Sequence, residues 1–142
     1  MNDVAQINLP ASHDIAQVLK QHQIVPTAQR QQIAAELLCK HQHVSADQLY
    51  HQLYQQGTQV SKATIYNTLG LFVEKGLLRE ICIDSSRSYY DSNTSPHHHI
   101  FNEDTGELID ISEAVLQGLD QSQLPSQTRT EQVELLIRVR NS

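Results

Sequence analysis

The sequence of 142 residues has no tryptophan, only two cysteines and 5% aromatic residues. A charged share of 18% beside a hydrophobic share of 39% excludes an intrinsically disordered chain and suits a globular one. No apolar run reaches the roughly 18 residues that a membrane-spanning helix needs. The opening MNDVAQINLP lacks the basic and apolar regions of a secretory signal, so a cytoplasmic protein is expected. Cys39 and Cys82 each lie in an apolar segment, and both are expected to be reduced residues of the core.

Positive charge is scarce in the last third of the chain. Residues 1–90 carry 7 basic and 7 acidic residues, whereas residues 91–142 carry 3 basic and 9 acidic ones. The second segment therefore holds the whole net charge of −6. This pattern indicates either a solvated acidic surface or two domains with different tasks, of which only the first is fit to approach a polyanion.

The first half of the sequence predicts a series of short helices followed by a β-hairpin. Helix signals are an apolar stripe, an N-terminal Ser or Thr cap and a glycine just past the end. They mark helices over residues 13–22, from the Thr27 cap to about residue 40, from the Ser45 capping box to Gly57, and from the Ser61 cap to Gly76. LLREICID and SYYDS then predict two strands around the turn at residues 84–87. Together these elements indicate a winged helix; a small helical bundle of unknown purpose is the alternative.

The helix that begins after Ser61 has the features of a DNA-reading helix. Ala63, Thr64 and Asn67 face away from its apolar stripe, and Tyr66 lies on the flank. Small residues permit close approach to the floor of the major groove, and an Asn there can pair with adenine. The candidate DNA-binding residues are Lys20, Arg30, Ser61, Lys62, Ala63, Thr64, Tyr66 and Asn67, with Lys75, Arg79 and Arg87 as further candidates for phosphate contacts.

From Ser95 the pattern changes to strand, helix and strand. HHHIFNED and GELIDI predict a hairpin, SEAVLQGLDQ predicts a short helix capped by Ser112, and VELLIRVR predicts a last strand. These residues are too few to bury a convincing core alone, so a homodimer is expected.

Three consecutive histidines precede this hairpin. Because side chains alternate along a strand, His97 and His99 point to one face and His98 to the other. A hairpin that turns between Asp104 and Thr105 places Asp110 across from His99, close enough to share a metal ion. Imidazole and carboxylate ligands suit Fe²⁺, Mn²⁺ or Zn²⁺. A single histidine of this kind is more often merely solvated.

The runs HVSADQLYHQL and VSKATIYNTLGLFVEKGLL, followed by Y-Y-D-x₅-H-x-H, resemble the ferric uptake regulator family over about residues 13–140. The resemblance implies an α+β fold, with an N-terminal winged helix-turn-helix domain followed by a small α/β dimerisation domain. The expected boundaries are a tail at 1–12, the DNA-binding domain at 13–91, a hinge at 92–96, and a dimerisation and metal-sensing domain at 97–142. The resemblance also implies the interdomain metal ligands His43, Asp91, His97, His99 and Asp110.

The chain departs from the family pattern at several positions. Asn102 and Thr105 stand where the family often has the first cysteine pair of a structural zinc site, and no cysteine follows Cys82. No structural four-cysteine zinc is therefore expected. Pro96 replaces a ligand of the family's second sensing site, and Val25 replaces a basic residue.

The resemblance implies a non-enzymatic, metal-dependent transcription repressor that acts as a homodimer on palindromic, AT-rich DNA. One divalent ion per subunit is expected, Fe²⁺ or Mn²⁺, with Zn²⁺ as another candidate. The ligand spacing is similar to the peroxide-sensing branch, in which bound Fe²⁺ reacts with peroxide and ligand histidines are oxidised. The triple histidine is similar to the iron response regulators, which implies haem binding at His97, His98 and His99 as an alternative. A small non-haem iron enzyme and a metal-buffering protein are the alternatives from other classes.

Overall fold

The computed structural model describes residues 14–112 and 121–142. The chain folds as two compact units, the first ending at Thr94 and the second beginning at Ser95, and each is described by itself. Within the described ranges, no helix is long and apolar enough to cross a membrane.

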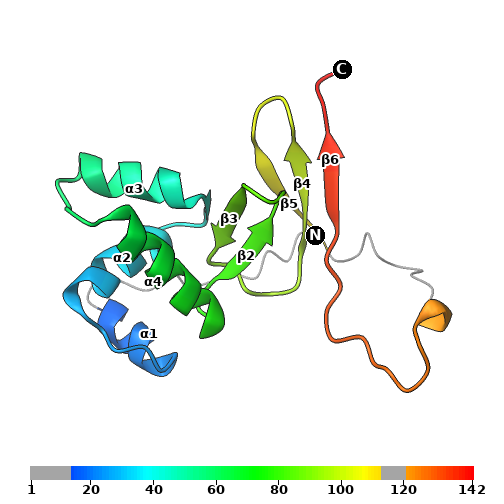
Figure 1. Ribbon diagram of the computed structural model, residues 1–142, viewed down its shortest axis with the longest axis horizontal. Helices are drawn as coiled ribbons and strands as arrows, with labels where there is room; N and C mark the ends of the chain where they lie inside the picture. The colour runs from blue at the N-terminus through cyan, green and yellow to red at the C-terminus, as the bar shows by residue number, and fades with distance from the viewer. Residues whose placement is uncertain (1–13, 113–120) are drawn as a thin grey trace, which may run out of the picture. The chain divides into compact units, whose positions relative to one another are not determined.

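The N-terminal unit is a winged helix. Its elements in chain order are α1 (Ile15–Gln21), α2 (Ala28–Leu38), β1 (His43–Val44), α3 (Ala46–Gln55), α4 (Lys62–Glu74), β2 (Arg79–Cys82) and β3 (Ser88–Asp91). The three strands form an antiparallel sheet in the order β1-β3-β2. Figure 1 shows α3 and α4 beside each other, with the β2–β3 hairpin following α4 as the wing.

The predicted helix caps are confirmed. The side chain of Thr27 accepts a hydrogen bond from the Arg30 N–H, and that of Ser61 accepts one from the Thr64 N–H. Ser45 forms the complete capping box with Gln48. These side chains satisfy backbone donors that have no partner within the helix, which is why the helices begin at these positions.

Apolar side chains from every helix of this unit meet in one core, and Leu19, Ile33, Leu49, Leu69 and Phe72 are fully buried there. Burial of each such side chain contributes about 1.5–3 kcal/mol.

The prediction that the two cysteines belong to the core is wrong. Cys39 and Cys82 are both free and exposed. Cys39 lies at the end of α2, where its thiol donates to the Glu36 carbonyl at 3.2 Å. Cys82 lies between buried Ile81 and Ile83, so strand alternation turns its side chain outward.

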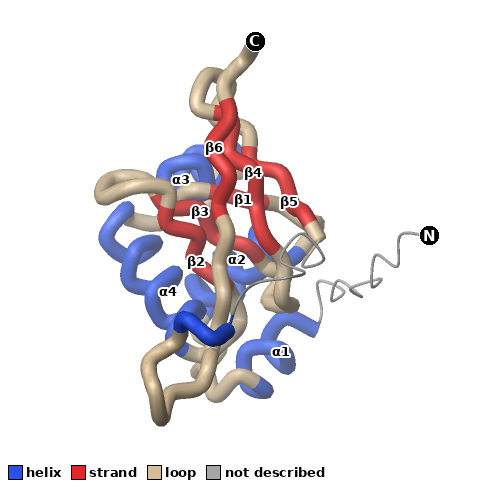
Figure 2. The backbone as a smooth tube through the Cα atoms, turned by 90° about the vertical axis from the view of Figure 1, so that its right-hand side faces the viewer, coloured by secondary structure: helices blue, strands red, loops and turns tan. Residues whose placement is uncertain are grey.

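The C-terminal unit contains a three-stranded sheet of β4 (His98–Asn102), β5 (Leu108–Ile111) and β6 (Leu136–Val139). A short 3₁₀ helix, η3 (Gln121–Gln123), lies between β5 and β6 in the chain. The order is β5-β4-β6, with β4 antiparallel to β5 and parallel to β6. Figure 2 shows these strands side by side. The helix predicted after Ser112 falls mostly on residues 113–120, outside the described residues.

The β4–β5 register confirms the predicted hairpin, because His99 pairs with Asp110. One face of the sheet carries His99 and Phe101, and Phe101 is fully buried. The other face carries Ile109, Ile137 and Val139, whose exposed fractions are 45%, 38% and 36% among the described residues.

Candidate metal centre and nucleic-acid interface

Two histidines and one aspartate converge in the C-terminal unit. The Nε2 atom of His99 lies 3.1 Å from Oδ1 of Asp110, and the Nε2 atom of His97 lies 3.4 Å from the same oxygen. The two imidazole rings meet edge to face, with their centroids 4.5 Å apart. Because one ligand atom from each residue lies within 4.8 Å of the others, the three side chains are close enough to bind one ion.

The hydrogen bond on the far side of the His97 ring decides what its Nε2 atom can do. Nδ1 of His97 lies 2.6 Å from the carbonyl oxygen of Ser95, which can only accept, so Nδ1 carries the hydrogen. In the neutral ring Nε2 is then a bare acceptor, and it faces a carboxylate oxygen that is also an acceptor. A cation between them removes this repulsion. A backbone carbonyl that holds Nδ1–H is also the usual support of a metal-ligating histidine.

A second, smaller ligand group lies in the N-terminal unit. The two-residue strand β1 pairs with β3 so that His43 is directly opposite Asp91. Nε2 of His43 lies 3.1 Å from Oδ2 of Asp91, while Oδ1 of Asp91 accepts the Asn93 N–H at 2.8 Å. The Asn93 N–H thus orients one oxygen of the Asp91 carboxylate, and the other oxygen faces His43.

Before the structure, only the family resemblance indicates His43 as a ligand, because its local sequence carries no strand signal. β1 is too short for a periodic signal, and its pairing with β3 joins residues far apart in the chain. The only local hint is Val44, which is buried immediately before the Ser45 cap.

The middle histidine is placed differently from its neighbours. His98 is 2% exposed, and its Nδ1 atom accepts a hydrogen bond from the Leu135 N–H at 3.1 Å. The ring hydrogen is therefore on Nε2, which has no hydrogen-bond partner among the described residues. Strand alternation leaves His98 either solvated or free for a second ligand, and its burial against the residues that lead into β6 excludes the first alternative. Haem binding at this histidine stays a prediction.

Helix α4 presents most of the predicted DNA-reading side chains to solvent. Ser61, Lys62, Ala63, Tyr66 and Asn67 are exposed, whereas Thr64 is half-buried. The Nζ atom of Lys62 lies 3.8 Å from Oδ1 of Asp47 and 5.2 Å from the centroid of the Tyr50 ring, both on α3. This long side chain is thereby held over α3 near the start of α4.

The other basic residues predicted to contact phosphates differ in their surroundings. Lys20 is exposed on α1, whereas the Arg30 guanidinium donates to the Val25 carbonyl at 3.0 Å. In the wing, Arg87 pairs with Asp84 at 2.6 Å. Hydrogen bonding from Arg87, and then from the Ser86 N–H, holds the pKa of the Asp84 carboxyl well below its usual range.

Known proteins resemble this chain in both sequence and fold. Residues 21–138 match the model of the ferric uptake regulator family. The peroxide-responsive repressor PerR of Staphylococcus aureus (strain Mu50) is 39% identical over 93 residues, which are 66% of this chain and 63% of that protein. PerR of Staphylococcus epidermidis is 37% identical over 95 residues, or 67% of this chain and 63% of that protein. The matched region thus spans less than two thirds of these curated relatives.

The crystal structure of the Vibrio cholerae ferric uptake regulator has a TM-score of 0.76 and 25% identity to this chain, covering 89% of this chain and 98% of that one. The family match covers both units, and the winged helix and the strand-rich C-terminal unit agree with it. The chain therefore belongs to the ferric uptake regulator family, whose members are transcription regulators and not enzymes.

Proposed function

We propose that this protein is a metal-dependent, DNA-binding transcription repressor. The observation that carries the proposal is the convergence of His97, His99 and Asp110, whose ligand atoms lie close enough to bind one ion. This set of imidazole and carboxylate ligands is suited to a divalent cation. The exposed outer side of α4 supplies the surface that DNA binding needs.

The proposed ligands of one regulatory ion are His43, Asp91, His97, His99 and Asp110. Two carboxylates bring a formal charge of −2, which a divalent ion offsets. Mixed imidazole and carboxylate donors suit Fe²⁺ and Mn²⁺, and Zn²⁺ is a further candidate. Because His43 and Asp91 belong to one unit and the other three ligands to the next, an ion bound by all five would restrict how the two units move.

On DNA, α4 is proposed to enter the major groove. Asn67 and Ala63 would face base edges, and Ser61 and Lys62 at the start of the helix would contact phosphates. The proposed surface also includes Tyr66 and Thr64 of α4, together with Lys20 and Arg30 from the preceding helices. A palindromic, AT-rich operator and an action in the cytoplasm, where transcription is regulated, follow from the same proposal.

The protein is proposed to act as a homodimer through its C-terminal unit. Ile109, Ile137 and Val139 form an exposed apolar row on one sheet face of the described residues, and burial against a second copy would remove this surface from water. Two copies also match the two halves of a palindromic site. Sedimentation of the full chain tests this point: a monomer at micromolar concentration would contradict it.

Peroxide is the proposed signal, because curated relatives at 37–39% identity are peroxide-responsive repressors. When bound, Fe²⁺ would supply the electron that activates peroxide. Oxidation of a ligand histidine should then add about 16 Da to peptides that contain His43 or His97, and Mn²⁺ should protect them. Haem titration is the competing test. A saturable Soret shift that disappears in a variant lacking His97, His98 and His99, without peroxide-dependent oxidation, would favour iron or haem input.

DNA binding tests the proposed function directly. Duplexes are first selected from a random library with the full chain and Mn²⁺, and their affinity is then measured by fluorescence anisotropy in Mn²⁺ and in EDTA. We expect the wild type to respond to the metal and Asp110→Ala to lose the response, while Glu107→Gln on the same hairpin behaves as the wild type. Equal affinity of the wild type and Asp110→Ala under both conditions would exclude a regulatory ion at this site. Failure to select any duplex would contradict the proposed DNA binding.

A further inference from the structure

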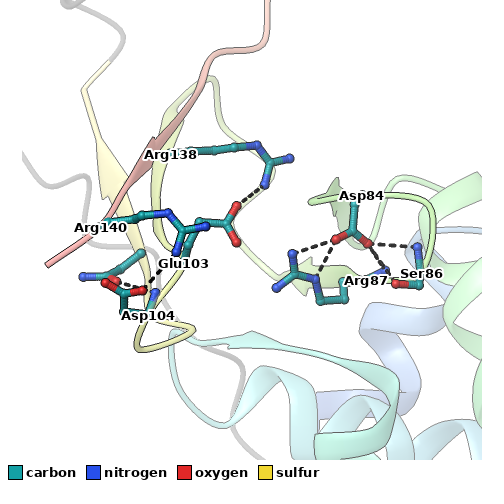
Figure 3. A network of polar contacts seen from close by, with 8 residues as sticks. Asp84, Ser86, Arg87, Glu103, Asp104, Arg138 and Arg140 are labelled. Atoms are coloured by element: carbon teal, nitrogen blue, oxygen red, sulfur yellow. Dashed lines mark hydrogen bonds and ion pairs between the residues drawn. The ribbon is translucent and has the colours of Figure 1, made fainter.

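Polar side chains join the β4–β5 turn to the residues at the end of β6. The contacts in this group connect residues 35–39 positions apart, and several of them are drawn in Figure 3. We call this group the C-terminal clasp; its members are Asn102, Glu103, Asp104, Arg138, Arg140 and Asn141.

Asn102 holds the turn and reaches the C-terminal segment with the same amide. Its Oδ1 atom accepts the backbone N–H groups of Asp104 at 2.9 Å and of Thr105 at 3.2 Å. Since both partners are donors, the oxygen must be on that side and the nitrogen on the other. Nδ2 then donates to Oδ1 of Asn141 at 2.9 Å.

Asp104 uses both carboxylate oxygens in the same connection. Oδ2 accepts the backbone N–H of Asn141 at 2.8 Å, and Oδ1 lies 3.2 Å from Nη1 of Arg140. One residue earlier, Oε1 of Glu103 pairs with Nη1 of Arg138 at 2.7 Å, and the Glu103 N–H donates to the Val139 carbonyl at 2.9 Å. Side chains and backbone thus hold the same two segments together.

The structural zinc that the family pattern implies does not fit this part of the chain. A structural zinc site takes thiolates or imidazoles. Asn102 and Thr105 stand where a cysteine pair would be needed, and no cysteine occurs after Cys82. The Asn102 amide is also already engaged by three partners, none of which is a metal ligand.

We propose that the C-terminal clasp is a metal-free fastener, which holds the C-terminal strand on β4 where relatives of this family use a bound metal. The strand needs such a fastener because β6 has only four residues and, among the described strands, pairs in parallel with β4 only. Exposed ion pairs are individually weak, so the clasp acts through its combined contacts and weakens at high salt.

Hydrogen exchange of the full chain tests the clasp without relying on metal or DNA binding. We expect Asp104→Ala to raise exchange of the residue 136–141 amides about fivefold, as loss of two charge-assisted contacts predicts. Glu107→Ala is the matched control, because it removes the same charge from the same hairpin outside the clasp, and its exchange should stay within about twofold of the wild type. If Asp104→Ala does not fold, Arg140→Gln serves as the milder test variant and Arg129→Gln, which lies outside the clasp, as its control.

Metal content provides the second arm of the test. In the Asp110→Ala background, which removes a proposed regulatory ligand, the dialysed protein should retain no zinc and should keep wild-type protection of residues 136–141 in EDTA. Tightly held zinc in this variant, or loss of that protection in EDTA, would overturn the proposal. Equal exchange in Asp104→Ala and Glu107→Ala would overturn it as well.

Discussion

Replacing Asp110 by asparagine should change stability in opposite directions with and without metal. In the neutral form of the His97 ring, Nε2 carries no hydrogen and faces the Asp110 carboxylate oxygen at 3.4 Å. An asparagine amide can turn its nitrogen to this position and donate to the imidazole. The substitution therefore converts a repulsive contact into a hydrogen bond, and it lowers the negative charge of the site.

The magnitude follows from the net value of one hydrogen bond. A gain of about 1 kcal/mol is expected for Asp110→Asn in EDTA, equivalent to a rise of about 4 °C in the midpoint of thermal unfolding. In the wild type, Mn²⁺ at about 100 times its dissociation constant should add about 2.7 kcal/mol. Asp110→Asn keeps a neutral oxygen but loses the carboxylate charge, so less than about a third of this increment should survive.

The assay is thermal unfolding at pH 8, followed by circular dichroism, in EDTA and in Mn²⁺. Asp110→Ala is the first control, since it removes the repulsive contact without supplying a donor and should gain less stability in EDTA than Asp110→Asn. Glu107→Gln is the second, with the same change of charge outside the site, and it should behave as the wild type in both buffers. The reasoning fails if Asp110→Asn is less stable than the wild type in EDTA, or if it keeps the full Mn²⁺ increment.

Three further predictions concern other parts of the molecule. Ser61→Ala should lower the free energy of unfolding by about 1 kcal/mol in urea titration, because it removes the cap of α4; no change would show that the cap is dispensable. Because Arg87 lowers the pKa of Asp84, the stability from this carboxylate is present above its ordinary pKa of about 3.9 and is lost only as the pH falls through the lowered value. In an NMR titration, the chemical shift of the Asp84 carboxyl carbon should therefore show an ionised group at pH 3.5, and Arg87→Gln should return its titration midpoint to the ordinary aspartate value. An ordinary midpoint in the wild type would contradict the ion pair. His98→Leu should speed exchange of the Leu135 amide by leaving a half-buried N–H without its acceptor, whereas His98→Asn should retain protection; equal exchange in both variants would argue against this hydrogen bond.

Where the chemistry is local, the sequence by itself determined the outcome. Ser45 and Ser61 cap their helices because a hydroxyl and a backbone N–H three residues later are neighbours in any helix start. The β4–β5 hairpin follows in the same way. A short turn between Asp104 and Thr105 fixes the register of its two strands, and this register pairs His99 with Asp110. These interactions need no information from the rest of the fold.

Only the tertiary structure decided which distant segments meet. β1 brings His43 to Asp91, although nothing in its two residues signals a strand. The packing of the β6 connection buries His98, which alternation alone left solvated or open to a second ligand, and the outward turn of Cys82 is visible only once its neighbours Ile81 and Ile83 are seen to be buried. Long-range contacts depend on how the whole chain closes its loops and shares its buried surface, so they have no signature in a window of neighbouring residues.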